Sequence, residues 1–191
     1  MDPTYYDSVV ENLAECCLQE MKVSDALLHW TYLSHRHPSI LTSERLAECF
    51  LLMGDLSASH SSLQECRMEM STKHCEEEIR TQIRATEEAV NKCNEELSEA
   101  RQWLALNQPE KAIGPLLSCR ECAPFWRTPF LLLLRCYVKC VKTDEAYALV
   151  QDACPWLRHI ELKHKMPTIP LSTPFFSELS HSKEVDESLV G

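Results

Sequence analysis

The sequence predicts an all-α fold, an α–α superhelix (solenoid) of about four helix pairs with a long central helix. Only three of its 191 residues are Gly, too few for the many tight turns of a β-sandwich or barrel. Large apolar and small residues recur at spacings of three, four and seven, as they do in amphipathic helices. The whole pattern returns after 33 or 34 residues, which is typical of stacked helical hairpins.

Two repeats are expected over residues 5–72. Each consists of two short helices separated by a polar break with helix-start chemistry, Ser24-Asp25 in the first repeat and Gly54-Asp55 in the second. Pro38 closes the first repeat, because a helix cannot continue through it. Small residues stand where the two helices of a pair approach most closely; they are Ala14, Ala26, Ala47 and Ser59.

A long linking helix is expected over residues 73–106, running into the third repeat. The spacing between the second and third repeats exceeds 34 by 19 residues. From His74 to Leu106 there is no Pro or Gly, and oppositely charged residues pair at i, i+4. A thin apolar stripe follows the helical period: Ile79, Ile83, Val90, Leu97 and Leu104.

The third and fourth repeats are expected over residues 93–160. Ala112 and Ala146 are equivalent small residues 34 positions apart, and Thr128-Pro129 opens the fourth repeat with a capping residue and a first-turn Pro. Beyond them, residues 161–191 contain several Pro and then polar sequence without helical period. This composition predicts a flexible tail, in which Phe175-Phe176 is a candidate docking motif.

The repeat resembles the tetratricopeptide repeat family. The resemblance rests on a small residue and an aromatic one in the first helix, as in Ala47 and Phe50, a small residue that opens the second helix, and a closing Pro. The linking helix gives a distant likeness to the repeat region of J-domain co-chaperones. No J domain is present, because His37-Pro38 is followed by Ser39 rather than Asp. The resemblance implies a concave groove that binds a peptide or helix of another protein.

The resemblance also implies which residues line this groove. Related co-chaperones that hold acidic carboxy-terminal tails have Lys and Asn at two positions of the first repeat, where this chain has Glu11 and Glu15. Carboxylates repel an acidic tail, so that clamp is predicted to be absent, and a basic or apolar partner is expected. The full predicted set is acidic at one end and mixed at the other: Glu11, Glu15, Glu44, Glu48, then Leu97, Arg101, Leu131, Arg135 and nearby Lys139.

Composition argues against several classes of function. With a formal net charge of −10, a broad nucleic-acid surface is not expected, because such surfaces depend on Lys and Arg. No apolar run approaches the length of a membrane span, and the amino terminus lacks the layout of a secretory signal. Eleven cysteines, an odd number, favour reduced thiols over a disulfide framework. We therefore expect a cytoplasmic or nuclear protein that does not contact membranes.

Two Cys pairs, Cys119 with Cys122 and Cys136 with Cys140, have spacings that resemble a four-thiolate zinc site. However, the cysteines follow the repeat, which favours packing as small buried apolar side chains. No catalytic motif is recognisable, so no enzyme activity and no cofactor is expected. The sequence favours an adaptor or co-chaperone-like scaffold. The alternatives are an obligate structural subunit of a larger helical multiprotein complex and a zinc- or thiol-dependent protein.

Overall fold

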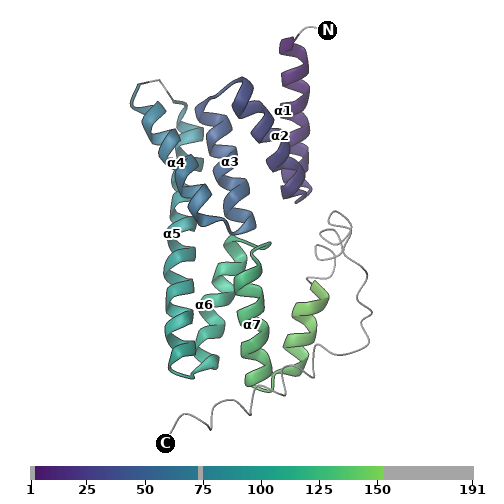
Figure 1. The fold of residues 1–191 in the computed structure, drawn as a ribbon, viewed down its shortest axis with the longest axis vertical. Coiled ribbons are helices and arrows are strands. Elements are labelled where there is room, and N and C mark those ends of the chain that lie inside the picture. Colours follow the sequence, from purple (N-terminus) through teal and green to yellow (C-terminus); the bar gives the residue numbers. More distant parts are fainter. Residues whose placement is uncertain (1–2, 73–74, 153–191) are drawn as a thin grey trace, which may run out of the picture. The chain divides into compact units, whose positions relative to one another are not determined.

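The computed structural model describes residues 3–72 and 75–152, with side chains from Tyr5 onward. Every regular element in these ranges is a helix (Figure 1), which confirms the all-α fold class. A further helical segment covers residues 143–152. The seven helices before it are α1 (Pro3–Gln19), α2 (Val23–Arg36), α3 (Ile40–Met53), α4 (Leu56–Met70), α5 (Glu77–Ala105), α6 (Pro109–Cys122) and α7 (Arg127–Lys139).

The chain divides into two units, residues 1–149 and 150–191, and the helices α1 to α7 all belong to the first. The tail expected over residues 161–191, with Phe175-Phe176, lies outside the described residues. Within the described ranges, no helix combines the length and the apolar character that crossing a bilayer requires.

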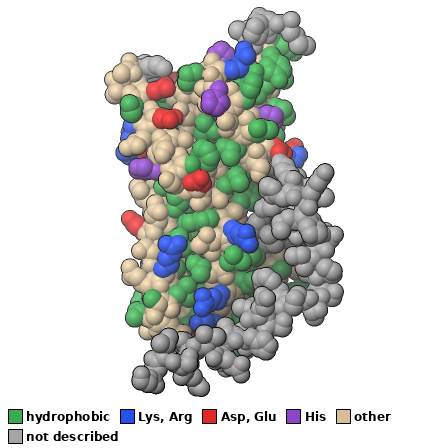
Figure 2. All heavy atoms as spheres, in the orientation of Figure 1, with side chains coloured by type: hydrophobic (Ala, Val, Ile, Leu, Met, Phe, Trp, Pro, Cys, Tyr) green, Lys and Arg blue, Asp and Glu red, His purple; other side chains and the backbone are tan. Residues whose placement is uncertain are grey.

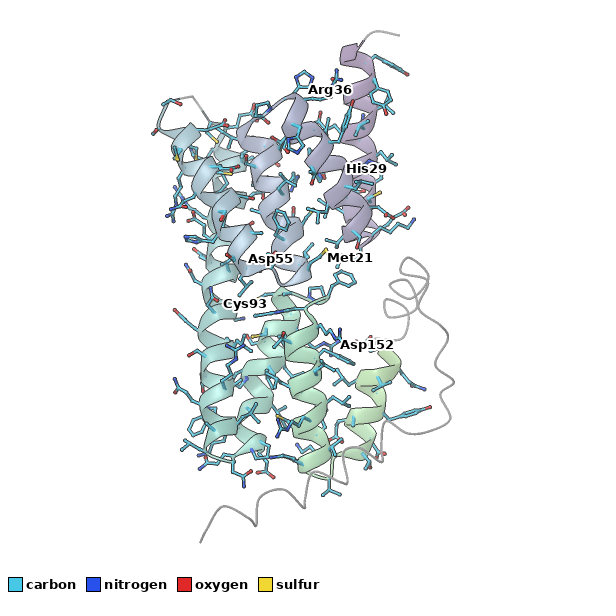
Figure 3. All side chains as sticks on the ribbon, viewed as in Figure 1. Met21, His29, Arg36, Asp55, Cys93 and Asp152 are labelled. Carbon is cyan, nitrogen blue, oxygen red and sulfur yellow. The ribbon has the colours of Figure 1, made fainter. Side chains whose placement is uncertain are left out.

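Consecutive helices form hairpins. Helix α1 packs on α2, α3 on α4, and α5 on α6, while α2 also packs on α3 and α6 on α7. Met21, in the turn between α1 and α2, and Asp55, in the turn between α3 and α4, lie at the same end of their hairpins (Figure 3). The first two hairpins therefore run in the same sense.

The hairpins close on the small residues that the sequence indicated. The Ser59 hydroxyl on α4 donates a hydrogen bond of 2.8 Å to the Ala47 carbonyl on α3, so these two backbones are in direct contact. A larger side chain at either position would separate the helices. The equivalent residues are all buried: Ala14, Ala26, Ala47, Ser59, Ala100, Ala112 and Ala146.

The same backbone turn follows the first helix of every hairpin. Met21, Gly54, Asn107 and Val141 each have a positive φ, between 53° and 79°. The next amide donates to a carbonyl five residues earlier in each case, over 2.8 to 2.9 Å. This is the Schellman motif, which ends a helix and reverses the chain. The accepting residues are Cys17, Phe50, Trp103 and Tyr137.

Helix α5 belongs to two groups of helices. Its first half packs on α3 and α4 and its second half on α6. With 29 residues it is about 43 Å long. The helix expected over 73–106 thus begins at Glu77 and ends at Ala105, while residues 73 and 74 lie outside the description.

A second link joins the two groups. The Phe125 amide, in the connection between α6 and α7, donates to the Leu52 carbonyl over 3.1 Å. The ring of Trp126 lies against Gly54 so closely that a Cβ at Gly54 would come within 2.0 Å of it. The end of α3 is thereby fixed to the α6–α7 connection, more than 70 residues later in the chain.

Candidate partner-binding site

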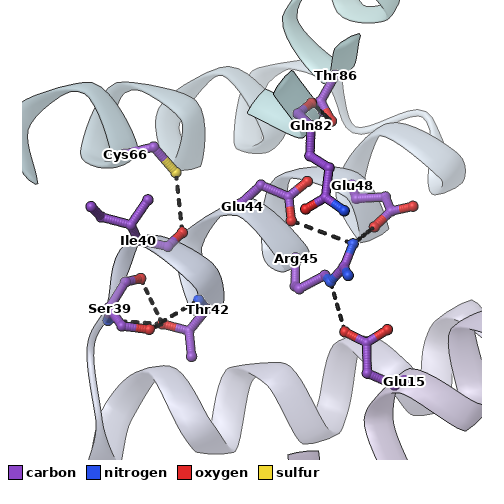
Figure 4. A network of polar contacts seen from close by, with 10 residues as sticks. All are labelled: Glu15, Ser39, Ile40, Thr42, Glu44, Arg45, Glu48, Cys66, Gln82 and Thr86. Atoms are coloured by element: carbon purple, nitrogen blue, oxygen red, sulfur yellow. Dashed lines mark hydrogen bonds and ion pairs between the residues drawn. The ribbon is translucent and has the colours of Figure 1, made fainter. Parts of the chain in front are cut away.

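The four carboxylates predicted for the acidic end of the groove do not form an open acidic surface. Three of them converge on Arg45 of α3, whose Nε lies 2.7 Å from Glu15 and whose Nη1 lies 3.0 Å from Glu48 and 3.5 Å from Glu44 (Figure 4). Glu15 belongs to α1, so the cluster also ties α1 to α3. Only Glu11 remains exposed without a partner in this cluster.

The groove prediction is wrong for Glu44, because its side chain is only 1% exposed. Helix α5 covers it, with Gln82 and Thr86 lying over the carboxylate (Figure 4). Burial raises the pKa of Glu44 to about 7, although Arg45 opposes this shift and Glu48 and Glu15 add to it. A buried carboxylate with this pKa cannot serve as a contact for a partner.

The prediction is also wrong for Leu97, which is buried on α5. The apolar stripe along α5 packs against its own neighbours rather than facing a groove. The remaining residues of the second half are exposed: Arg101 on α5, and Leu131, Arg135 and Lys139 on α7.

These exposed residues form most of one stripe along α7. Leu131, Arg135 and Val138 follow at i, i+4 and i+7, and the two apolar side chains are 40% and 43% exposed. Lys139 adjoins them, and its Nζ donates to Asn107 over 3.5 Å. We call Leu131, Arg135, Val138 and Lys139 the α7 stripe. In the described part of the chain, no ion pair involves Arg135 or Lys139.

Charge is distributed unevenly along the chain. Residues 100–142 contain seven Lys or Arg and two Glu, in a protein whose net charge is −10. On the face shown in Figure 2, Lys and Arg side chains gather in the lower half, over the region of α6 and α7, among exposed hydrophobic groups. This half of the structure offers a mixed apolar and cationic surface.

The cysteines proposed for zinc are separated. Cys119 on α6 faces Cys93 on α5, where each thiol points at the other residue's carbonyl, at 3.6 and 4.0 Å. Figure 3 labels Cys93 at the middle of α5. Cys136 is buried in α7, while Cys122 and Cys140 are half-buried. Among the residues described, no three Cys, His, Asp or Glu side chains come together to hold a metal ion.

Three of the buried thiols, Cys49, Cys66 and Cys93, have the properties of packing residues. Burial raises the pKa of Cys49 and of Cys66 to about 12, and the Cys119 thiol together with burial raises the pKa of Cys93. A thiol with a raised pKa contains little thiolate, which is the nucleophilic and metal-binding form.

Sequence reasoning missed one further feature, a cleft of about 530 Å³ where α1 and α2 meet the start of α3. Asp7 lies at its edge, with one carboxylate oxygen 3.2 Å from Nε of Arg36 and the other 2.7 Å from Nε2 of His37. These contacts hold the start of α1 against the end of α2. The only sequence signal was the position of Asp7 near the start of the first hairpin and of Arg36 and His37 at its end.

Comparison with known proteins identifies no relative of this chain. No protein-family model, no curated protein and no solved structure matches the chain.

Proposed function

We propose that this protein is a non-catalytic scaffold of the tetratricopeptide type, an adaptor or co-chaperone-like module that binds a peptide or helix of another protein. The α7 stripe carries this proposal. It presents two apolar and two cationic side chains on one helix, exposed and without ion pairs among the described residues.

The tetratricopeptide-like interpretation is supported by the four equivalent turns. Their positive-φ residues are separated by 33, 53 and 34 positions, the same spacings as the small residues. A backbone geometry that returns with the sequence repeat indicates one hairpin unit used several times. Stacked units of this kind leave one continuous helical surface open to a partner.

The stripe favours a particular chemistry in the partner. Because Glu15, Glu44 and Glu48 point towards Arg45, their carboxylates are engaged inside the protein rather than presented to a basic peptide. At the α7 stripe, Leu131 and Val138 can take apolar side chains while Arg135 and Lys139 attract carboxylates. The partner segment best suited to this surface is apolar with interspersed acidic residues.

Selection from a random peptide library displayed on phage, against the immobilised full chain, tests this function. We expect enrichment of apolar peptides that contain Asp or Glu. The double variant Leu131→Ser with Arg135→Glu should bind an enriched peptide at least tenfold more weakly, by fluorescence anisotropy, because it loses one apolar contact and reverses one charge.

A matched control uses exposed residues elsewhere. Met68→Ser with Arg84→Glu makes the same chemical changes on α4 and α5 and should leave binding unchanged. If the library yields no peptide above background, or if both double variants bind equally well, the proposed function is wrong.

The alternative, a structural subunit of a larger helical complex within the cytoplasm or nucleus, is favoured by a different observation. Helix α1 lies at one edge of the first unit, and several of its large apolar side chains are exposed. A subunit of this kind should aggregate when purified alone, whereas an adaptor should remain in solution. Light scattering of the purified full chain separates the two.

A further inference from the structure

The outer face of the first hairpin exposes six large apolar side chains. On α1 these are Tyr5, Tyr6, Val9 and Leu13, exposed by 65%, 50%, 47% and 47%, and on α2 they are Leu28 and Tyr32, exposed by 67% and 36%. We call these six residues the α1–α2 outer face. It is separate from the α7 stripe and goes beyond the function proposed above.

The six residues form two helical rows that meet at one contact. Val9 and Leu13 are one helical turn apart, as are Leu28 and Tyr32, and Tyr5 and Tyr6 lie one turn before Val9. The rings of Tyr6 and Tyr32 meet edge to face, with centroids 6.2 Å apart, which connects the two helices.

Charged residues of α1 lie away from this face. Asp7, Glu11 and Glu15 recur every four residues and therefore share one side of the helix. Asp7 contacts the end of α2, Glu11 lines the cleft beside it, and Glu15 reaches Arg45 on α3. On the opposite side of α1, the outer-face residues are accompanied by the uncharged Asn12 and Cys16. This side of the helix therefore carries no charged side chain.

The exposed apolar area of this face indicates the kind of contact it can make. At roughly 200 Å² for a fully exposed large side chain, the six residues expose about 600 Å². This equals the upper end of the roughly 300–600 Å² patches found on monomers. It also approaches the roughly 800 Å² that each partner contributes to a stable interface.

We propose that the α1–α2 outer face is the interface between two copies of this chain, related by a two-fold axis that crosses α1 near Val9. A two-fold interface must be complementary to itself. In an antiparallel pair of α1 helices centred on Val9 and Val10, Tyr6 of each copy meets Leu13 of the other, because these residues are equally distant from the centre. A large ring then packs against a medium side chain at both ends.

The charged residues at the rim are already paired within one chain. Arg36 lies at the Tyr6 end of the face, where it stacks over Tyr32 and pairs with Asp7. Glu20, after Leu13 at the opposite end, pairs with Lys22. Two copies can therefore meet at this face without bringing an unpaired charge into contact.

Sedimentation equilibrium of the full chain over 1–100 μM tests the proposal. We expect a dimer of twice 22.0 kDa. Leu13→Glu should weaken dimerisation at least 100-fold, since it places two carboxylates in an apolar contact. Met68→Glu, at an exposed apolar position of α4, is the matched control and should remain dimeric. Circular dichroism verifies that both variants fold.

Crosslinking tests the geometry. In a Cys16→Ser background, Val9→Cys should form a disulfide-linked dimer under air oxidation, identified by peptide mapping. Leu13→Cys alone should not, whereas a mixture of Tyr6→Cys and Leu13→Cys chains should crosslink to each other. A monomer at every concentration, a dimer that survives Leu13→Glu, or efficient crosslinking of Leu13→Cys with itself would overturn the proposal. Peptide binding at the α7 stripe should be the same in Leu13→Glu, so failure of either proposal leaves the other standing.

Discussion

Arg45 is the residue on which the polar interior of the first two hairpins depends. It is one cation among three carboxylates, contributed by α1 and α3, and its side chain is mostly buried. The single positive charge of Arg45 compensates only part of the negative charge of the three carboxylates. The pKa of Glu44, the most deeply buried of them, is raised, so Glu44 stays protonated to a higher pH. The cluster is therefore sensitive both to substitution and to pH.

Substitution of Glu44 by Gln should change how stability depends on pH. Because the pKa of Glu44 is about 7 in the folded protein and about 4.3 when unfolded, the folded state binds more protons between these values. Its stability should therefore fall as pH rises from 5 to 8. We expect Glu44→Gln to be more stable than the wild type by roughly 2 kcal/mol at pH 8 and by little at pH 5, measured by urea unfolding.

The exposed Glu88 provides the control for this measurement. Glu88→Gln should show the same difference from wild type at both pH values, because its carboxylate is solvated. A Glu44→Gln variant whose stability relative to wild type does not change with pH would mean that Glu44 is ionised throughout.

Removal of Arg45 should be costly. Arg45→Met leaves Glu15, Glu44 and Glu48 without their cation, and uncompensated buried charge costs about 3 kcal/mol or more. The denaturant guanidinium chloride is a salt and would screen these charges, so unfolding should be measured in urea. Arg67→Met, which breaks the exposed pair with Glu87, should cost less than about 1 kcal/mol. Equal losses in the two variants would contradict the role given to the cluster.

At the scale of the element, the turn after each first helix is the most regular feature of the fold. Four turns share one hydrogen-bonding pattern, but only one of them contains Gly at the left-handed position. Asn107 tolerates this conformation, whereas Val141 is β-branched and strained there. The packing of the hairpins evidently fixes the turn even where the residue opposes it.

Val141→Gly should therefore stabilise the protein. Val141 has a φ of 57° and is 80% exposed, so its replacement removes strain and almost no packing. We expect a gain of about 1 kcal/mol, measured as an increase in the urea midpoint. Val138→Gly, within α7, should instead lose roughly 0.5 kcal/mol from helix propensity. A loss in both variants would show that Val141 is not strained.

The sequence could predict the elements because each has a local signal. Helical period, the break at Gly54-Asp55 and the small residues at the crossing points together located the hairpins to within a few residues. The break expected at Ser24-Asp25 is wrong, because both residues lie inside α2 and the turn is at Met21. It could not predict that Glu44 and Leu97 are buried, because period alone does not say which neighbouring helix covers a given side. The convergence of Glu15 and Glu48 on Arg45 likewise depends on the distance between α1 and α3.

At the scale of the whole molecule, the contact of Gly54 with Trp126 joins helices that are far apart in sequence. Gly54 has a φ of 79° and no room for a Cβ. Gly54→Ala should therefore cost about 3 kcal/mol, from backbone strain and from displacement of the Trp126 ring. In a Trp126→Ala background the same substitution should cost only about 1 kcal/mol, because only the strain remains.

A double-mutant cycle by urea unfolding measures this coupling. Additive losses in the two single variants would contradict the contact. Gly114→Ala is the reference for the method, since nothing lies within 4 Å of a Cβ at that helical position, and it should gain about 0.5–1 kcal/mol.

Because α5 is unbroken, it restricts the insertions that the gene can tolerate. Each residue added to a helix turns everything after it by about 100°. One codon inserted near Val90 would carry Leu97 and Ala100 off the surface of α6 while Ile83 stayed in place against α3 and α4. Seven inserted codons would restore the facing to within about 20°, but they would lengthen α5 by about 10 Å. The contacts of Phe125 with Leu52 and of Trp126 with Gly54 fix the distance between the two groups of helices, so this stretch should not tolerate insertions.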